Sequence, residues 1–333
     1  MIEVYKDFEL VTMNPVFSTC MWRRRFSRPG EFQFVTHFTP DNFNLFDISQ
    51  VVYMRHVDEA AFVESRNIIQ TLEGELRLII RGRSLTSLLD RRTITHSGHF
   101  DLQTLLSDIV NNNFLAGAGE LRSMAPGVRL LPFSLPAINV SAEYRNRSAL
   151  DAITDLLGEN QIGVRVRYNF ENRSFDIEFY QPSETDVVFS KVFSNIFEQD
   201  FYEDIEGYKN VVLDGDNDIH NNTTYRGFAR REMAVPEPRE GSQTLSQTGQ
   251  DALWANSHTR TLSSTVNPFN KQFEYIKDWS LGNVVLSENR EIGFSEREVI
   301  TEITEFYDET GMNIEVNTGN YLERGDRRGN SNR

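Results

Sequence analysis

Hydrophobic and polar residues alternate along the first third of the chain, and this period of two is typical of β-strands. In MWRRRFSRPGEFQF, residues 21–34, one face of a strand would carry two aromatic residues and an arginine: Trp22, Arg24 and Phe26. The opposite face would carry the neighbouring arginines, Arg23 and Arg25. Arg28-Pro29-Gly30 supplies a turn, and Phe32 and Phe34 alternate on the return. The stretch predicts a β-hairpin, and Pro29 and Gly30 fit more than one loop length.

Four arginines in one hairpin raise the question of a nucleic-acid contact. The flanks do not extend the positive charge, because acidic residues follow it: Glu31, Asp41 and Asp47. Binding of a phosphate backbone needs more clustered cations than this. We therefore interpret the arginines as solvated, or as paired with carboxylates on neighbouring strands, and keep a dedicated contact with an anion or a partner as the alternative.

Further strands complete a first β-rich module. Residues 51–53 lead to 60–62, and residues 67–69 lead into GELRLIIRG, residues 74–82. After Gly82 the spacing becomes helical, with Ser84 as the expected N-cap and leucines at positions 85, 88 and 89. A strand, a glycine and a short capped helix close this module near residue 94.

Helical periodicity marks the middle third. DLQTLLSDIVNNNF, residues 101–114, places five apolar residues on one stripe: Leu102, Leu105, Leu106, Ile109 and Val110. The Gly- and Pro-rich stretch 116–136 is expected to be irregular. A second helix begins with a capping-box-like Ser148 and Asp151 and ends at Gly158, where a helix C′ glycine belongs.

The segment GVRVRYNFENRSFDIEFY, residues 163–180, predicts a hairpin with a defined register. Apolar residues face each other in three pairs: Val164–Phe179, Val166–Ile177 and Tyr168–Phe175. The same register sets Arg165 opposite Glu178 and Arg167 opposite Asp176. Arginines fit here as cross-strand partners of acids, which favours the same interpretation for residues 23–25.

The last third is β-rich again but interrupted. Strand patterns occupy three stretches: 187–213, 271–290 and 297–316. Between them, residues 231–264 have neither a sustained period nor enough apolar residues for a core, so we predict an excursion with one short helix near 250–256. Asp308 to Gly311 is expected to be a hairpin turn. The charged, Gly-rich tail is predicted to be disordered.

Composition limits the classes of function. The 333 residues are enough for two or three domains, and 49 acidic residues against 34 Lys and Arg give a formal net charge of -15. This charge argues against general nucleic-acid affinity. The single cysteine, Cys20, excludes an internal disulfide and a cysteine-based zinc site. The first residues resemble no signal peptide and no apolar run has membrane-helix length, so we expect synthesis in the cytoplasm.

Two stretches imitate metal sites. His96 and His99, with Asp101 beside them, lack a third strong ligand and are more typical of a surface loop. DGDND, residues 214–218, begins like a calcium loop, but isoleucine and tyrosine stand at the sixth and twelfth positions, where glycine and glutamate are needed. An interstrand turn is the better interpretation. We predict no metal and no cofactor.

No catalytic constellation is recognisable. Cys20 and His37 could be paired as nucleophile and base, but no local signature supports this. The chain contains no phosphate-binding loop, no G-x-S-x-G and no H-E-x-x-H. The sequence therefore predicts a protein that is not an enzyme and that has a structural or assembly role.

An ordered set of segments resembles the tail-tip or baseplate-hub proteins of tailed bacteriophages, including the N-terminal part of tail-associated lysins. The segments are W-R-R-R-F-x-x-P-G-x-F (22–32), L-x-I-x-G-R-S-L-T-x-L-L-x-R-R (78–92), D-W-S-L-G-N-V-V (278–285) and I-T-E-I-T-E-F-Y-D-E-T-G-x-x-I-E-V-x-x-G (300–319). The resemblance spans nearly the whole chain. The family usually has aspartate where this chain has Asn283, and the excursion matches poorly.

The resemblance implies an α+β, β-rich fold in which two small β-barrel domains flank an α+β domain. The implied division has five parts: a first barrel (1–94), an α+β domain (95–189), a second barrel (190–226 plus 265–322), an inserted excursion (227–264) and a disordered tail (323–333). Three chains would form a ring. Two similar barrels in each of three copies would give six quasi-equivalent positions, which suits a six-fold tail tube.

The implied function is a structural one at the tip of a virion tail. The ring would cap the tail tube and form part of the DNA-ejection conduit during entry into the host, with DNA only in transit along an acidic lumen. Ordinary solubility is the alternative reason for the negative net charge. The implied partners are further copies of the chain, the tail tube or distal tail protein, the tape-measure protein, and spike or receptor-binding proteins. Candidate assembly contacts are Trp22, Arg24, Phe26, Phe32, Gly82, Arg83, Ser84, Leu85 and Gly282, and their alternative role is barrel scaffolding.

Three alternatives stay open. The chain could be the hub part of a cell-wall lysin. It could be a carbohydrate-binding tail adhesin, for which Trp254 is the best candidate contact. It could also serve a phage-derived contractile injection device, which would use the same hub.

Overall fold

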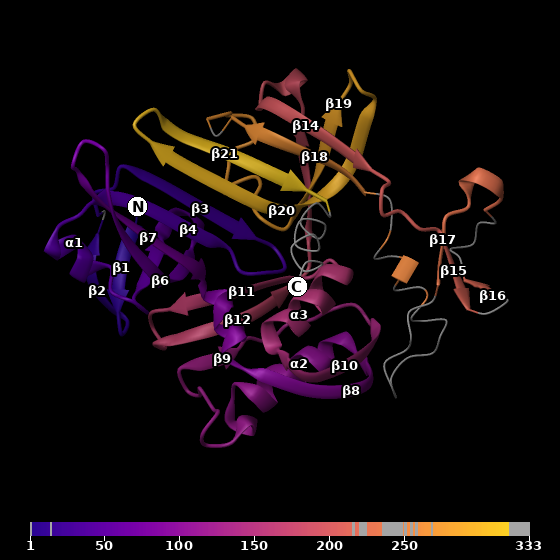
Figure 1. Cartoon of the computed structure of the whole chain (residues 1–333), viewed down its shortest axis with the longest axis horizontal. Coiled ribbons are helices and arrows are strands. Elements are labelled where there is room, and N and C mark those ends of the chain that lie inside the picture. The colour runs from indigo at the N-terminus through magenta and orange to yellow at the C-terminus, as the bar shows by residue number, and fades with distance from the viewer. Residues whose placement is uncertain are drawn as a thin grey trace.

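The computed structural model describes residues 2–13, 15–214, 217–219, 225–234, 249, 252–253, 256, 259–267 and 269–319. The fold is mostly β, and the two longest of the described helices lie in the middle of the chain. Figure 1 shows three parts: N-terminal strands, C-terminal strands beside them, and the helix-containing middle part below both. The predictions for the tail 323–333 and for Trp254 fall outside the described residues.

The N-terminal strands match the alternating pattern of the sequence. They are β1 (Ile2–Lys6), β2 (Glu9–Met13), β3 (Thr19–Arg25), β4 (Glu31–His37), β5 (Val51–Met54), β6 (Glu59–Gln70) and β7 (Leu76–Ser84). The short helices between and after them are α1 (Pro40–Leu45), η1 (Arg55–Val57) and η2 (Leu85–Arg91). The predicted hairpin is β3–β4, in which Trp22 faces Phe32.

The middle part contains both predicted long helices. Its elements are β8 (Thr93–Asp101), α2 (Leu102–Asn113), η3 (Ala116–Ala118), β9 (Val128–Leu130), β10 (Asn139–Ser148), α3 (Ala149–Glu159), β11 (Gly163–Asn169) and β12 (Ser174–Tyr180). Asp101 caps α2 and Ser148 caps α3 through their side chains. All five residue pairs predicted for the hairpin 163–180 are present between β11 and β12.

The C-terminal part holds the remaining strands. They are β13 (Ser183–Phe189), β14 (Ile196–Asp204), β15 (Val211–Asp214), β16 (Asn217–Ile219), β17 (Glu232–Ala234), β18 (Thr259–Val266), β19 (Asn283–Asn289), β20 (Phe294–Asp308) and β21 (Gly311–Thr318). Two single-turn helices accompany them, η4 (Lys191–Phe193) and η5 (Gly227–Ala229). The predicted turn closes β20–β21, because Asp308 pairs with Gly311.

One sheet of 13 strands joins the two ends of the chain. Its main path runs β14-β18-β21-β20-β3-β4-β7-β6-β5-β1-β2; off this path, β19 pairs with β20 and β13 pairs with β19. The pairing of β20 with β3 connects the C-terminal strands to the N-terminal strands. The middle part and the β15–β17 segment form three smaller sheets of their own.

Three apolar cores lie against this sheet and the middle part. One core is built around Trp22 and Phe34 of the N-terminal strands. A second is built around Trp279 and Ile303 of the C-terminal strands. The third and largest packs the inner faces of α2 and α3 against strands of the middle part and against side chains such as Phe62 from the first part. Burial of these faces is the main favourable term in folding.

Several local expectations are wrong. His96 and His99 lie on strand β8 and not in a loop, and β9 forms within the stretch 116–136 that was expected to be irregular. The Ser84 side chain does not cap η2; its hydroxyl accepts a hydrogen bond from the Gly30 N–H at 3.0 Å. Strand β18 begins inside the stretch 231–264 that was expected to lack regular structure, because its backbone pairs with β14 and β21.

Replacement of Gly82 by alanine should destabilise the fold, because β6 and β4 crowd this position. A Cβ at Gly82 would lie 1.7 Å from the Phe62 carbonyl oxygen and 2.7 Å from Phe32 Cε1. We expect the free energy of unfolding to fall by about 3 kcal/mol in urea titrations. Gly127→Ala is the control, because its Cβ would meet only the Met124 carbonyl at 3.4 Å. Equal losses in the two variants would contradict this account.

Candidate functional site

The contact between β3 and β20 is the place where the N- and C-terminal parts of the chain are tied together, and we call it the β3–β20 seam. Six residue pairs form it, from Cys20–Tyr307 to Arg25–Glu302. The three consecutive arginines lie on β3 at this seam, so their side chains alternate between its two faces. One face of the seam is polar, whereas the other carries Arg24 and Glu305 among buried apolar side chains such as Trp22 and Ile303.

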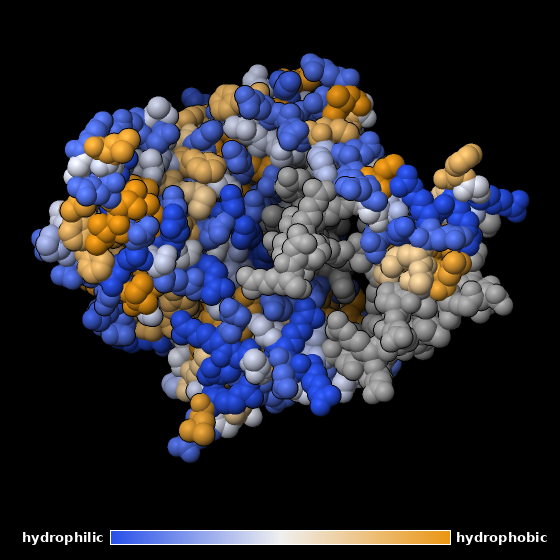
Figure 2. Space-filling model, in the orientation of Figure 1, coloured by the Kyte–Doolittle hydropathy of each residue, from blue (hydrophilic) through white to orange (hydrophobic). Residues whose placement is uncertain are grey.

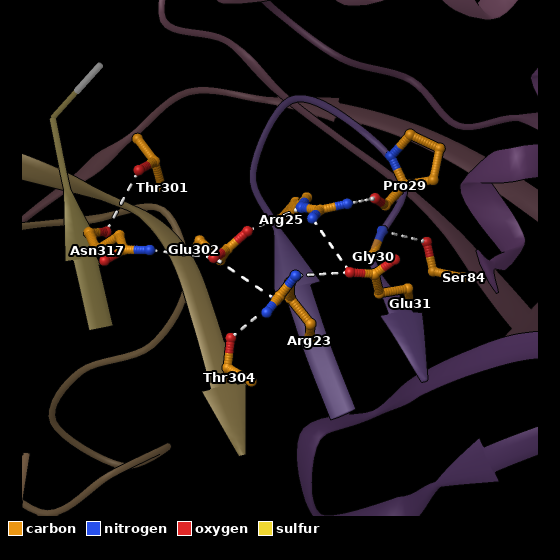
Figure 3. A network of polar contacts seen from close by, with 10 residues as sticks. All are labelled: Arg23, Arg25, Pro29, Gly30, Glu31, Ser84, Thr301, Glu302, Thr304 and Asn317. Carbon is orange, nitrogen blue, oxygen red and sulfur yellow. Dashed lines mark hydrogen bonds and ion pairs between the residues drawn. The ribbon is translucent and has the colours of Figure 1, made fainter. Parts of the chain in front are cut away.

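On one face, two arginines bind two glutamates (Figure 3). Arg25 Nε donates to Glu302 at 2.8 Å, and Arg23 Nη1 donates to Glu31 at 2.6 Å. Each arginine also approaches the other glutamate, within 3.7 Å. Asn317 of β21 donates to Glu302 at 3.0 Å. This network confirms the interpretation of Arg23 and Arg25 as partners of carboxylates on neighbouring strands.

On the opposite face, Arg24 is buried between the two β cores, with 5% of its surface exposed. Its Nη2 donates to the Tyr275 hydroxyl at 2.6 Å, and that hydroxyl donates to Glu305 at 2.5 Å. The other Glu305 oxygen lies 2.7 Å from His56 Nε2 and accepts a hydrogen bond from Tyr307. The cluster therefore links β3 and η1 of the first part to β20 and Tyr275 of the last part.

The pKa values of the two glutamates nearest to Arg24 are shifted in opposite directions. Burial raises the pKa of Glu305, but the hydrogen bond from His56 and the positive charge of Arg24 outweigh burial and hold the pKa below 4.5. Burial raises the pKa of Glu59 to about 7, although Arg24 Nε lies 3.9 Å away and Trp22 Nε1 donates to the carboxylate at 3.3 Å. Glu305 is the ionised partner of Arg24 in this pair.

The candidate assembly contacts from the sequence have partners inside the chain. Eight of the nine are buried: Trp22, Arg24, Phe26, Phe32, Gly82, Ser84, Leu85 and Gly282. Arg83 is partly exposed and binds Glu64 and Asp90. Gly282 has φ +83° and an added Cβ would lie 2.7 Å from Phe26, so the structure brings these two candidates together across the seam. Their contact with another chain stays a prediction.

Exposed apolar side chains mark a surface that the sequence did not single out. They lie on β2, on the β6–β7 hairpin and in the connection before β3: Leu10, Val11, Met13, Val16, Ile68, Ile69, Leu72 and Leu76. Figure 2 shows apolar side chains gathered at the left of the molecule, where α1 and β2 lie in Figure 1. The signal in the sequence was a run such as Leu10-Val11, where apolar residues occupy both phases of a strand.

Cys20 is buried, and burial raises the pKa of its thiol well above the ordinary value, so it is not a ready nucleophile. Within the described ranges, no three His, Cys, Asp or Glu residues are grouped to hold a metal ion. None of the described helices is long and apolar enough to cross a membrane.

Comparison with solved structures places the fold among phage tail proteins. The chain is similar to the 43 kDa tail protein of prophage MuSo2 from Shewanella oneidensis, with 13% identity, TM-score 0.63, and 96% and 97% of the two chains covered. It is similar to prophage tail protein gp18 from Listeria monocytogenes EGD-e, with 17% identity, TM-score 0.58, and 96% and 94% covered.

A third similar structure is the E. coli protein c3393, a type VI secretion component described as similar to the bacteriophage T4 tail proteins gp27 and gp5. Identity is 11%, the TM-score is 0.52, and 96% of this chain and 76% of that chain are covered. No curated protein matches the sequence. The model of the Siphovirus ReqiPepy6 Gp37-like protein family matches residues 2–227 and 237–320. The chain belongs to this family of siphovirus tail proteins, as its resemblance to tail proteins predicts.

Replacement of Glu302 by glutamine should loosen the seam. Glu302 is 5% exposed and is the acceptor shared by Arg25 and Asn317, so the neutral side chain leaves Arg25 with Glu31 as its charged partner. We expect a loss of about 2 kcal/mol in the free energy of unfolding. The control is Glu184→Gln, which removes an exposed pair with Arg297 and should cost less than about 0.5 kcal/mol. A loss no larger than that of the control would contradict this role.

Replacement of Glu59 by glutamine should change the pH dependence of stability. A folded pKa of about 7 means that the folded state keeps a proton that the unfolded state loses near pH 4.5. This contribution is therefore present below pH 4.5 and disappears as pH rises through 7, a change of roughly 3 kcal/mol. The lowered pKa of Glu305 stabilises the folded state above pH 4.5, and this contribution is lost only as the pH falls below that value. Thermal melts from pH 5 to 8 should show a flatter profile for Glu59→Gln than for the wild type, and parallel profiles would refute the assignment.

Proposed function

We propose that this chain is a structural subunit of the tail tip or baseplate hub, in which three copies form a ring that caps the hexameric tail tube and surrounds part of the DNA-ejection path. Two small β-barrel domains, 1–94 and 190–226 plus 265–322, would flank the α+β domain 95–189, and residues 227–264 would be an insertion. The observation that carries the proposal is a repeated order of strands in the large sheet.

The four strands on each side of the seam have the same order. The N-terminal set runs β3-β4-β7-β6 across the sheet, and the C-terminal set runs β14-β18-β21-β20. If the strands of each set are numbered by their order along the chain, both sets lie across the sheet in the order first, second, fourth, third. The third strand is β6 in the N-terminal set and β20 in the C-terminal set. In each set, the strand that precedes it along the chain, β5 or β19, also pairs with it. This repetition supports two related modules in one chain.

The packing of the two modules supports the same conclusion. Each has one fully buried tryptophan against a phenylalanine: Trp22 and Phe32 have ring centroids 5.4 Å apart, and Trp279 and Phe189 5.0 Å. The modules differ at their far strands, because β1 is antiparallel to β5 whereas β13 is parallel to β19. The repeat is therefore strongest in the four strands beside the seam.

A duplicated module would resolve the mismatch between a three-fold ring and a six-fold tube. Two modules in each of three copies would present six similar surfaces, and a ring of this kind can contact a six-fold tube through equivalent interactions. The arginines at the seam are neutralised by glutamates, and the net charge of the chain is -15, so passing DNA would find no extended cationic surface on which to condense.

The same role in a phage-like injection device is a second candidate. The likeness of the fold to a type VI secretion component favours it. The hub role is the same in the two settings, so the assembly of the chain tests both.

Purified protein should assemble into a three-fold ring. Native mass measurement over a range of concentrations should give a species of three times the 38.5 kDa of the chain, and electron-microscope class averages should have an open centre with six peripheral lobes. Six lobes follow from two modules per copy. A monomer at every concentration, or a ring of another symmetry, would refute the proposed hub.

A further inference from the structure

Three arginines lie together on the surface of the middle part, and we call them the arginine cluster: Arg91, Arg92 and Arg122. Arg91 ends η2, Arg92 directly precedes β8, and Arg122 lies in the loop before β9. Arg91 and Arg122 are exposed, and Arg92 is partly exposed. The cluster lies outside the large sheet, in the part of the chain that Figure 1 shows below the two sets of β-strands.

Backbone carbonyls hold the arginine cluster together. Arg92 Nη2 and Nε donate to the Arg122 carbonyl at 2.7 and 3.1 Å, and Arg92 Nη1 donates to the Arg91 carbonyl at 2.8 Å. In return, Arg122 Nη2 donates to the Thr93 carbonyl at 2.8 Å and to Asn113 Oδ1 at 3.0 Å. Neutral acceptors therefore fix two of the guanidinium groups in place without cancelling their charge.

No carboxylate pairs with the cluster within the part of the chain that the structure describes. Arginines elsewhere bind acids, as Arg83 binds Glu64 at 2.8 Å, and this hydrogen bond raises the pKa of Arg83. For Arg92 the shift is reversed, because burial and then the positive charges of Arg122 and Arg91 lower its pKa. Like charges held close together repel one another, and an anion bound beside them would remove this cost.

The two acids adjacent to the cluster in sequence do not supply that anion. Asp90 binds Arg83 at 3.3 Å and accepts a hydrogen bond from Ser148 Oγ at 2.9 Å. Glu120 is exposed and forms no ion pair with any residue that the structure describes. The positive charge of the cluster is therefore available to a carboxylate from outside the chain.

A fully exposed leucine lies next to the cluster. Leu121 directly precedes Arg122, and 100% of its surface is exposed. The Ser123 N–H closes the turn around it by donating to the Gly119 carbonyl at 2.9 Å. A phosphate group would leave this apolar side chain uncovered, whereas a peptide can bring both carboxylates and an apolar residue.

We propose that the arginine cluster binds a short acidic segment of a partner protein, whose carboxylates contact the guanidinium groups and whose apolar residue packs on Leu121. Guanidinium groups bind carboxylates through paired hydrogen bonds. The net charge of -15 disfavours nucleic acid, because a long polyanion would extend beyond the cluster onto a surface that repels it. In the proposed ring, the two β modules contact the tube and the neighbouring copies, and the choice of a different protein as the partner rests on that proposal.

Peptide binding tests the cluster directly. The probe is a fluorescently labelled peptide, Glu-Glu-Leu-Glu-Glu, whose dissociation constant for the full chain is measured by anisotropy at low salt. Arg91→Gln combined with Arg122→Gln should weaken binding about tenfold, because charge-assisted contacts are lost. Arg92 stays unchanged because it holds the loop. The control is Arg290→Gln, which removes an exposed arginine that already pairs with Glu288 and should change binding less than about twofold.

A wild-type chain that does not bind the peptide, or a double variant that binds it as the wild type does, would overturn the proposal. Leu121→Ser should weaken binding of the probe about threefold and leave unchanged the binding of a peptide with serine in place of its leucine. Equal losses for the two peptides would overturn the apolar contact.

Three further outcomes separate the identity of the partner from the hub. A short single strand of DNA, or inorganic phosphate, that binds more tightly than the peptide through the same arginines would overturn the acidic protein segment. A double variant with an altered native mass would assign the cluster to a contact between copies and overturn the separate partner. A monomeric wild-type chain that binds the peptide through the cluster would support this site and refute the hub.

Discussion

The structure depends on the pairing of β20 with β3, and this pairing depends on compensation of charge. Three consecutive arginines on β3 put positive charge on both faces of the sheet, and on the buried face Arg24 has almost no access to water. An unpaired charge there would cost several kcal/mol. Glu302 on one face and Glu305 on the other supply the compensation, and both lie on the strand that joins the last third of the chain to the first. The basic hairpin is thus the place where two distant segments become one sheet.

Local features were predictable from the sequence, whereas distant partners were not. The hairpin 163–180 followed from apolar pairs and charge pairs that lie close together in the chain, α2 followed from its apolar stripe, and α3 followed from its stripe and the cap at Ser148. The partners of Arg23 and Arg25 include Glu31 nearby and Glu302, more than 270 positions away, and no local pattern identifies the latter. Strand β18 was missed because its order comes from backbone pairing with β14 and β21 and not from its own periodicity.

The candidate site shows the same division between local pattern and tertiary context. The alternation correctly put Trp22, Arg24 and Phe26 on one face, but the sequence could not reveal that this face lies between two cores. Residues conspicuous in the sequence motifs, such as Gly82 and Gly282, are constrained by close packing against Phe62 and Phe26. The exposed apolar side chains on β2 and the β6–β7 hairpin, such as Ile68, belong to no motif that the sequence singled out. Low identity with the similar tail proteins, 11 to 17%, is compatible with a shared fold because pattern and packing, more than particular residues, specify it.

The connection between the first and second strands of each module has a very different length in the two halves of the chain. β3 and β4 are joined by a tight turn, whereas the path from β14 to β18 includes a separate small sheet of β15, β16 and β17. Because the entropic cost of closing a loop grows only slowly with its length, such an insertion destabilises the rest of the fold only slightly. Two sets of strands with the same order can therefore differ at this connection, since one has a tight turn there while the other carries an additional small sheet.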